Sequence, residues 1–149
     1  FRRTGIKNMK FNAIVGNPPY QITTERTSDI PVYNYFMDVS FRLSSKVTLI
    51  TPARYLFDAG KTPHDWNLKI LNDEHFKVIW YKAKSTDVFP NVDIKGGVAV
   101  CYRDASQSFG KIGSFTAYPE LNNIYKKVVS ENVNFVPLSE IIYHKTSSI

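Results

Sequence analysis

The sequence predicts an α/β domain with a mixed sheet, and three observations support this class. Two short apolar runs, residues 11–15 and 46–50, have the length and composition of buried strands. The segment between them carries apolar residues at helical spacing, so a βαβ unit with a parallel strand pair and a right-handed crossover is expected. Two later apolar runs, residues 76–81 and 97–102, predict a terminal antiparallel strand pair.

The composition narrows the classes of protein to which the chain can belong. With 149 residues, 43% hydrophobic and 21% charged, it is long enough for one domain and too apolar to be disordered by default. A net charge of +6 is compatible with a polyanionic partner such as nucleic acid. The single Cys101 excludes an internal disulfide framework, and no apolar run has the length of a membrane span or a signal-peptide core. We therefore expect a protein of the cytoplasm.

The first predicted strand ends abruptly at Asn17. Pro18 and Pro19 have no backbone N–H and a fixed φ, so neither a strand ladder nor a helix can continue through them. The strand end therefore presents an amide side chain, two unpaired carbonyl groups and an exposed aromatic ring, that of Tyr20.

This set of groups can hold a planar aromatic amine. The Asn17 side-chain oxygen and the Pro18 carbonyl can accept the two protons of an exocyclic NH2 group, while Tyr20 stacks on the heterocycle. Such an amine is a poor nucleophile because its lone pair is delocalised into the ring. Two acceptors placed for a tetrahedral nitrogen favour the reactive geometry and so stabilise the transition state, without a catalytic His or carboxylate.

The tetrapeptide Asn17-Pro18-Pro19-Tyr20 after a hydrophobic strand resembles the catalytic motif of S-adenosylmethionine-dependent amino methyltransferases. It is most similar to that of the adenine-N6 DNA methyltransferases of bacterial restriction–modification systems. The resemblance implies that these four residues are catalytic. The alternative is an ordinary Asn-Pro turn. The tetrapeptide does not choose the substrate, since methylases of RNA guanine or of a protein glutamine amide resemble it here too.

Two helices are expected after the motif, beyond a polar loop at Gln21–Asp29. Pro31 can open the first, and its buried face should carry Val32, Tyr35, Phe36, Val39 and Leu43. Thr62 can cap the second, and its buried side should carry Trp66, Ile70 and Leu71. His64 and His75 have no neighbours at metal-ligand spacing, so we expect surface or capping roles and no metal site.

The loop between the last two predicted strands is the second informative segment. It carries Phe-Pro and Gly-Gly, and the run Asp87–Gly97 resembles the late motif of type II enzymes that combine endonuclease and methylase. The resemblance implies that Phe89 meets a flipped adenine on the side opposite Tyr20, which favours double-stranded DNA as the substrate. Extruding a base costs a few kcal/mol, and stacking at about 1–3 kcal/mol per base is of the size needed to offset it. The alternative is a long hairpin loop with one buried Phe.

The resemblance covers only the back half of a Rossmann-like methyltransferase sheet. In that family a Gly-rich loop before the catalytic motif holds S-adenosylmethionine, but sixteen residues precede Asn17 and the seven glycines form no Gly-x-Gly loop. We therefore expect residues 1–103 to be the substrate-pocket half and residues 104–149 a connector, with a helix opening at Pro119, that leads into a target-recognition region. The cofactor half would lie upstream, and methyl transfer would need no metal.

Three hypotheses follow. The first is an adenine-N6 DNA methyltransferase fragment with little activity alone, which could dimerise through the sheet edge where the cofactor half should join. The second is a methyltransferase acting on an amine or amide of RNA or protein, which would have no use for Phe89. The third is a noncatalytic nucleic-acid-binding module in which Asn17 is a turn residue.

Overall fold

The computed structural model describes residues 10–22, 29–130, 134–136 and 138. Contacts within the chain divide it into two compact units, Phe1–Phe115 and Thr116–Ile149, which are described separately below. Within the described residues, no helix is long and apolar enough to cross a membrane.

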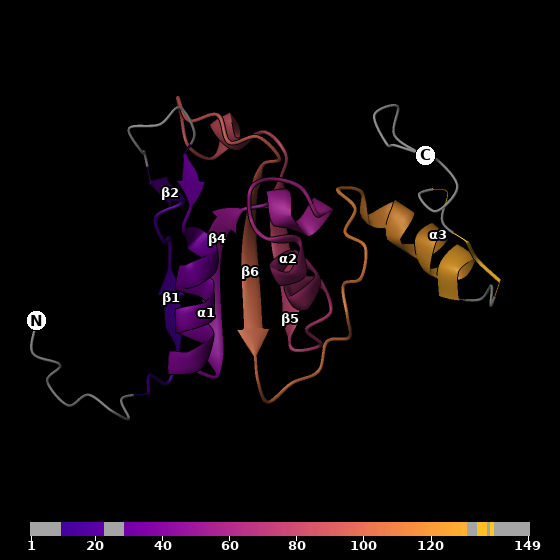
Figure 1. The fold of residues 1–149 in the computed structure, drawn as a ribbon, viewed down its shortest axis with the longest axis horizontal. Coiled ribbons are helices and arrows are strands. Elements are labelled where there is room, and N and C mark those ends of the chain that lie inside the picture. The colour runs from indigo at the N-terminus through magenta and orange to yellow at the C-terminus, as the bar shows by residue number, and fades with distance from the viewer. Residues whose placement is uncertain (1–9, 23–28, 131–133, 137, 139–149) are drawn as a thin grey trace, which may run out of the picture. The chain divides into compact units, whose positions relative to one another are not determined.

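The first unit is built on a four-stranded mixed sheet (Figure 1). Its strands lie in the order β1 (Ile14–Gly16), β4 (Lys46–Pro52), β6 (Val98–Asp104) and β5 (Phe76–Lys82). β1 runs parallel to β4, and β6 is antiparallel to both β4 and β5. The predicted α/β class, with a parallel pair and a later antiparallel pair, is confirmed. β1 and β5 form the two edges of this sheet. The predicted buried strand at residues 11–15 is wrong in extent and burial, because β1 covers only Ile14–Gly16 and, as an edge strand, leaves Val15 80% exposed.

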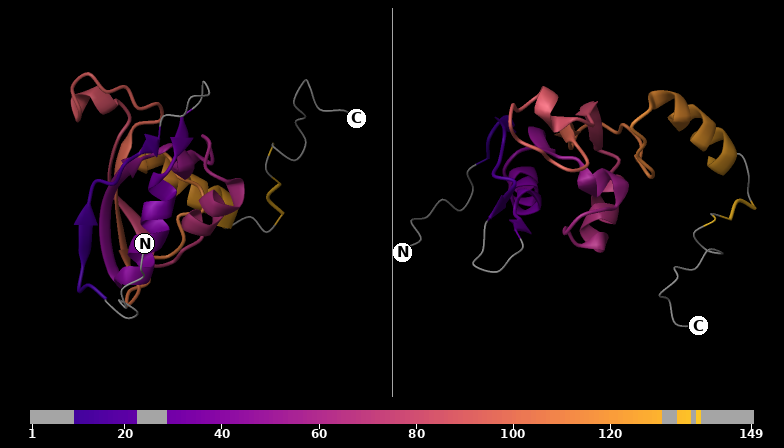
Figure 2. Two further views of the ribbon diagram at one scale, coloured as in Figure 1. Left: turned by 60° about the vertical axis from the view of Figure 1, so that its left-hand side comes forward. Right: turned by 90° about the horizontal axis from the view of Figure 1, so that it is seen from above.

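Helices α1 (Tyr33–Leu43) and α2 (His64–Leu71) cover the same face of the sheet (Figures 1 and 2). Burial alternates along β4 as this arrangement requires: Val47 and Leu49 are buried, whereas Thr48 and Ile50 are partly exposed. This period of two is the pattern of a strand with one covered face. The parallel crossover from β1 to β4 passes through α1, so the βαβ unit positions the end of β1 beside the end of β4.

The buried face of α1 differs from the predicted one. Tyr33 and Met37 are buried, while Tyr35, Phe36 and Val39 are exposed by 61%, 45% and 42%. The helix carries two apolar stripes, and the stripe at positions 33, 37 and 41 packs on the core. The other stripe, which the sequence favoured, faces outward in this unit. Pro31 does not open the helix, which begins at Tyr33.

Pro31 instead belongs to a short antiparallel ribbon after the motif. β2 (Gln21–Ile22) pairs with β3 (Ile30–Pro31), and the Tyr20 carbonyl accepts a hydrogen bond from the Val32 N–H at 3.1 Å. The predicted polar loop therefore begins and ends in paired backbone, and its residues 23–28 lie outside the described part. The ribbon fixes the direction in which the chain leaves Tyr20.

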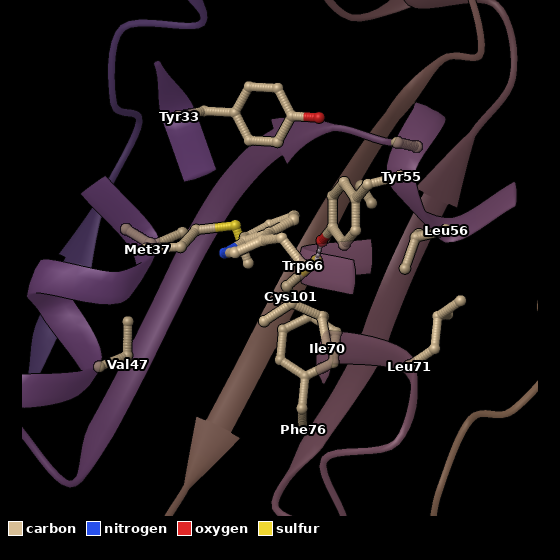
Figure 3. Close-up of a cluster of buried hydrophobic side chains, with 13 residues drawn as sticks. Tyr33, Met37, Val47, Tyr55, Leu56, Trp66, Ile70, Leu71, Phe76 and Cys101 are labelled. Carbon is tan, nitrogen blue, oxygen red and sulfur yellow. Dashed lines mark hydrogen bonds between the residues drawn. The ribbon is translucent and has the colours of Figure 1, made fainter. Parts of the chain in front are cut away.

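An aromatic cluster between sheet and helices forms the core (Figure 3). The ring of Tyr55 lies 5.3 Å from that of Trp66 and 5.8 Å from that of Tyr33. The Tyr55 hydroxyl also lies 3.0 Å from the sulfur of Cys101 on β6. Each buried aromatic or aliphatic side chain contributes roughly 1.5–3 kcal/mol. The predicted burial of Trp66, Ile70 and Leu71 is confirmed.

The start of α2 corrects the predicted cap. Thr62 is buried and donates its hydroxyl to the Asn67 side-chain oxygen at 2.7 Å. Pro63, not Thr62, occupies the cap position, and no side chain caps the helix. His64 is exposed and His75 partly exposed, in agreement with the expected surface positions. His64 pairs with Asp58 at 2.7 Å, and His75 contacts the Gln107 carbonyl.

The first unit extends to Phe115, whose ring lies 5.2 Å from Phe57 and 5.3 Å from Tyr81. The functional division predicted at residue 103 stays a prediction. In the second unit, α3 (Pro119–Ser130) begins at the predicted proline. Four of its apolar side chains are exposed by 39–58%, namely Leu121, Ile124, Tyr125 and Val128.

Candidate functional site

The site lies where the carboxyl ends of β1 and β4 meet. Because the two strands are parallel, their carboxyl ends lie at the same end of the sheet. Residues 17–20 follow β1 at this end, and Arg54 follows β4 there. Arg54 begins a short 3-10 helix, η1 (Arg54–Phe57). In Figure 1 the β2 ribbon and the loop between β5 and β6 lie at this same end of the sheet. Ligands of open α/β sheets bind at this end of the strands.

A cavity of about 420 Å³ opens at this end of the sheet. Tyr20 and Gln21 form one wall, Pro52 and Arg54 a second, and the residues 92–95 of the late loop a third. Its volume lies in the range of about 300–1,000 Å³ that is usual for small-molecule sites. The structure thus brings together the motif and the late loop, the two segments that sequence reasoning singled out.

Tyr20 is half-buried rather than exposed, because the ribbon after it folds its side chain inward. Its hydroxyl is buried and has no hydrogen-bond partner of normal geometry among the described residues. Burial raises the pKa of Tyr20 above its ordinary value, and the nearby Asn17 amide partly opposes this rise. The phenol is therefore neutral at physiological pH, and its ring forms an uncharged wall of the cavity.

The other residues of the motif lie at the edge of the cavity rather than in its lining. Asn17 and Pro19 are exposed, and Pro18 is partly buried. No described residue forms a backbone hydrogen bond with the Pro18 carbonyl. The cavity lining begins at Tyr20 and does not include Asn17 or Pro18, and the Asn17 amide lies near the Tyr20 hydroxyl.

Phe89 is partly buried and is not among the residues that line the cavity. Its backbone N–H donates to the Ser85 carbonyl at 2.8 Å, which turns the loop at this point. Val92 and Ile94, farther along the loop, are the apolar residues of this loop that line the cavity. The assignment of Phe89 to a flipped base stays a prediction.

Ser85 organises this loop, and sequence reasoning did not find it. It begins the short helix η2 (Ser85–Asp87) and is buried. Its hydroxyl donates to the Val92 carbonyl at 2.9 Å and accepts from the Ile94 N–H at 2.7 Å. One side chain therefore holds the segment that lines the cavity. Nothing in the local sequence distinguishes this serine from a solvent-exposed one.

Charged side chains surround the cavity. Among the described residues that line it, the cations are Arg54, Lys61 and Lys95, and the carboxylates are Asp29 and Asp93. Asp29 is already engaged: Gln21 donates its amide to the carboxylate at 2.6 Å, and Lys61 donates to the Asp29 carbonyl at 3.0 Å. The position of Arg54 could have been inferred from the sequence. A residue that follows β4 lies at the same end of the sheet as the motif that follows the parallel strand β1.

Comparison with known proteins identifies the family. The model of the Eco57I restriction-modification methylase family matches residues 1–89, a range that includes the tetrapeptide and ends at Phe89. The chain belongs to this family. The restriction–modification resemblance drawn from the motif is thereby confirmed.

A relative within this group is consistent with the match. A Mycoplasma pneumoniae protein described as an uncharacterized adenine-specific methylase is 31% identical over 105 residues, which cover 67% of this chain and 24% of that protein. The chain therefore matches about a quarter of the relative's length. No solved structure matches.

The described residues of this family member do not fit a complete S-adenosylmethionine site. Neither β1 nor β4 is followed by a Gly-rich loop, since the first runs into Asn17-Pro18 and the second into Ala53-Arg54. We assign no residue of the chain to the cofactor. Likewise, the described residues contain no group of three or more His, Cys, Asp or Glu side chains that could hold a metal ion.

Proposed function

We propose that the chain forms the adenine-binding part of a restriction–modification enzyme that transfers a methyl group from S-adenosylmethionine to N6 of adenine in double-stranded DNA. The observation that carries this proposal is the position of Tyr20, which follows Asn17-Pro18-Pro19 and lines the cavity at the ends of β1 and β4. The family match and the adenine-specific methylase named as a relative support it.

The proposed chemistry rests on two acceptors and a neutral ring. The Asn17 side-chain oxygen and the Pro18 carbonyl accept the two N6 protons. Asn17 is exposed, and no described backbone N–H donates to the Pro18 carbonyl. The two acceptors favour a tetrahedral nitrogen, whose lone pair is then available for transfer. Holding the amine in this geometry also raises the rate of transfer, because the nitrogen is aligned before the reaction.

The base itself would be held by stacking. An adenine in a duplex must be extruded to expose its amine, at a cost of a few kcal/mol. Tyr20 offers a ring on one side of the cavity, and Phe89 is the candidate for the other side after the loop adjusts. The neutral phenol avoids placing a negative charge beside the electron-rich base.

The remaining parts of the enzyme are proposals as well. The residues that hold S-adenosylmethionine and the domain that reads the DNA sequence would lie outside the described part, and residues 104–149 would lead into the latter. β1 is an edge strand whose Val15 is 80% exposed, so it offers a surface for the cofactor half or, in its absence, for a second copy. We expect the 149-residue chain alone to transfer methyl groups weakly or not at all.

Incorporation of labelled methyl groups into unmodified bacterial DNA tests this proposal. The 149-residue chain is compared with a longer polypeptide that adds a Gly-rich cofactor-binding half, and the labelled nucleosides are then identified. Label in N6-methyladenine with the longer polypeptide alone is the expected result. Label in RNA or protein, or no label with either polypeptide, would reject the proposal.

One observation favours the second hypothesis, a methyltransferase acting on an amine or amide of RNA or protein. Phe89 does not line the cavity, and an enzyme that does not extrude a base needs no second aromatic. The family match outweighs this observation, because the matched model is that of a restriction-modification methylase. Substitution of Phe89, discussed below, separates the two hypotheses.

A further inference from the structure

Arg54 stands out among the cavity residues because its backbone is fixed while its charge is not neutralised nearby. The Ala59 N–H donates to the Arg54 carbonyl at 3.1 Å, which closes the turn around η1. Among the described residues, no carboxylate forms an ion pair with the Arg54 guanidinium. Asp58, the nearest acid in the sequence, is held by His64 at 2.7 Å and by the Asn67 amide at 3.0 Å.

Two glycines hold the aliphatic part of the Arg54 side chain. A Cβ added to Gly96 would lie 2.5 Å from Arg54 Cγ, and one added to Gly60 would lie 3.4 Å from Arg54 Cβ. Both glycines have positive φ, +85° and +104°, which side-chain-bearing residues rarely adopt. Arg54 therefore occupies space that these glycines leave open, and it lines the cavity together with Gly60. A Cβ added to Gly60 would also lie 3.5 Å from Arg54 Nε, so the guanidinium end lies beside this cavity residue.

The surroundings of Arg54 favour an anion. The positive charge of Arg54 lies close enough to Tyr33 to oppose the effect of burial, which raises the Tyr33 pKa to about 12. Lys61 and Lys95 line the same cavity, so three cations there face two carboxylates. The carboxylates are Asp29, which accepts a hydrogen bond from the Gln21 amide, and Asp93. A guanidinium presents several N–H donors in one plane, and this geometry matches two oxygens of a phosphate.

We propose that Arg54 binds the phosphate of the nucleotide whose base stacks on Tyr20. This rests on the proposed function, since it places a nucleotide in the cavity that the motif helps to form. Phosphate contacts fix the position of a nucleic acid without reading its sequence. Arg54 is thus a positioning residue: it holds the backbone of the extruded nucleotide while Tyr20 and Asn17 hold its base.

Binding of three small probes to the 149-residue chain tests the assignment. Adenosine, adenosine 5′-monophosphate and inorganic phosphate are titrated by NMR at neutral pH into the wild type, Arg54→Met, Arg54→Lys and Arg42→Met. Arg42 is a matched control, because it is an exposed arginine on α1 that lines a different hollow. The backbone spectrum of each variant reports whether its fold is retained.

The wild type should bind the monophosphate about three- to tenfold more tightly than adenosine, the range for a partly exposed charge-assisted contact. Arg54→Met should remove this preference and leave adenosine binding within about twofold, whereas Arg42→Met should keep it. Arg54→Lys should keep part of the preference for the monophosphate, because lysine retains the positive charge but lacks the planar pair of guanidinium N–H donors.

The remaining outcomes separate the two proposals. Equal binding of adenosine and its monophosphate by the wild type, or an unchanged preference in Arg54→Met, overturns the role of Arg54 and leaves the base site standing. Phosphate binding that depends on Arg54, without adenosine binding, supports the anion site and contradicts the proposed function. If none of the three probes binds, both proposals are overturned.

Discussion

The hydroxyl of Ser85 accepts a hydrogen bond from the backbone N–H of Ile94 at 2.7 Å, across nine residues of the late loop. The same hydroxyl donates to the Val92 carbonyl at 2.9 Å. Both Val92 and Ile94 line the cavity that Tyr20 also lines. A single buried side chain therefore connects the irregular loop to the shape of the candidate site.

Ser85→Ala should weaken both the fold and the site. The substitution leaves a carbonyl and an N–H without their partner, and such a loss costs about 1–3 kcal/mol. Urea denaturation should show this decrease in the free energy of unfolding, and hydrogen exchange should show faster opening at Ile94. Ser45→Ala, at an exposed serine, is the control and should change stability by less than about 0.5 kcal/mol. Equal stability of the two variants would show that the hydroxyl does not hold the loop.

Gly96→Ala should displace Arg54. The added Cβ would meet Arg54 Cγ at 2.5 Å, and the residue would also be strained at its φ of +85°. Gly110→Ala is a matched control, because its φ is +80° and a Cβ there would meet nothing within 4 Å. We expect Gly110→Ala to cost about 1 kcal/mol of unfolding free energy from backbone strain alone, and Gly96→Ala to cost more. If thermal or urea unfolding gives both the same cost, the contact with Arg54 is soft and does not fix its side chain.

Stability should fall at high pH because of the buried Cys101 thiol. Burial raises the pKa of Cys101 from its ordinary value of 9.0 to about 11, and it raises the pKa of Tyr55 as well. Between about pH 9 and 11 the unfolded chain loses the thiol proton while the folded chain keeps it, so the free energy of unfolding decreases with pH, by up to about 1.4 kcal/mol per pH unit. Below about pH 9 this contribution to stability is fully present.

Cys101→Ala isolates this contribution. The variant will be less stable at every pH because a core side chain is shortened, so the informative quantity is the slope of stability against pH and not its level. Urea denaturation at several values between pH 8 and pH 11 should give a shallower decrease for the variant. A slope identical to that of the wild type would mean that the thiol does not titrate in this range.

Phe89→Ala separates DNA methylation by base flipping from the alternatives. If Phe89 stacks on the extruded adenine, its removal should lower methyl transfer to duplex DNA by the equivalent of about 1–3 kcal/mol, roughly 5- to 150-fold. Transfer to a substrate in which the target adenine is unpaired should fall less, because less extrusion is required. Unchanged transfer to both substrates would show that Phe89 does not stack on the target adenine.

The number of strands in the sheet and their directions could be predicted from the sequence, because each strand contains a short apolar run. The extent and burial of β1 could not, because they depend on its place at the edge of the sheet. The ribbon of β2 and β3 could not, since two-residue strands carry no periodic signal and depend on the Tyr20–Val32 hydrogen bond. The buried face of α1 was also beyond the sequence. The helix has two apolar stripes, and the packing of Tyr33 against Tyr55 and Trp66 decides which one is buried.

The site was predictable to the extent that it follows a motif. Tyr20 lines the cavity, and its role in binding a base stays a prediction. Ser85 is found only once the loop is folded, because its role depends on hydrogen bonds to Val92 and Ile94. Arg54 lies between these cases. Its place after β4 follows from strand order. The space that its side chain occupies depends on Gly96, which lies forty-two residues later in the chain.

The central claim is that the Asn17 amide holds the reacting amine, and its most direct test compares transfer with binding. Asn17→Ala is made in the polypeptide that includes the cofactor-binding half, together with Asn12→Ala, an exposed asparagine before β1, as the control. The methylation rate of duplex DNA and the affinity for that DNA are measured for both. We predict that Asn17→Ala abolishes transfer while DNA affinity stays within about threefold, and that Asn12→Ala changes neither. Retained turnover in Asn17→Ala would contradict the proposed mechanism.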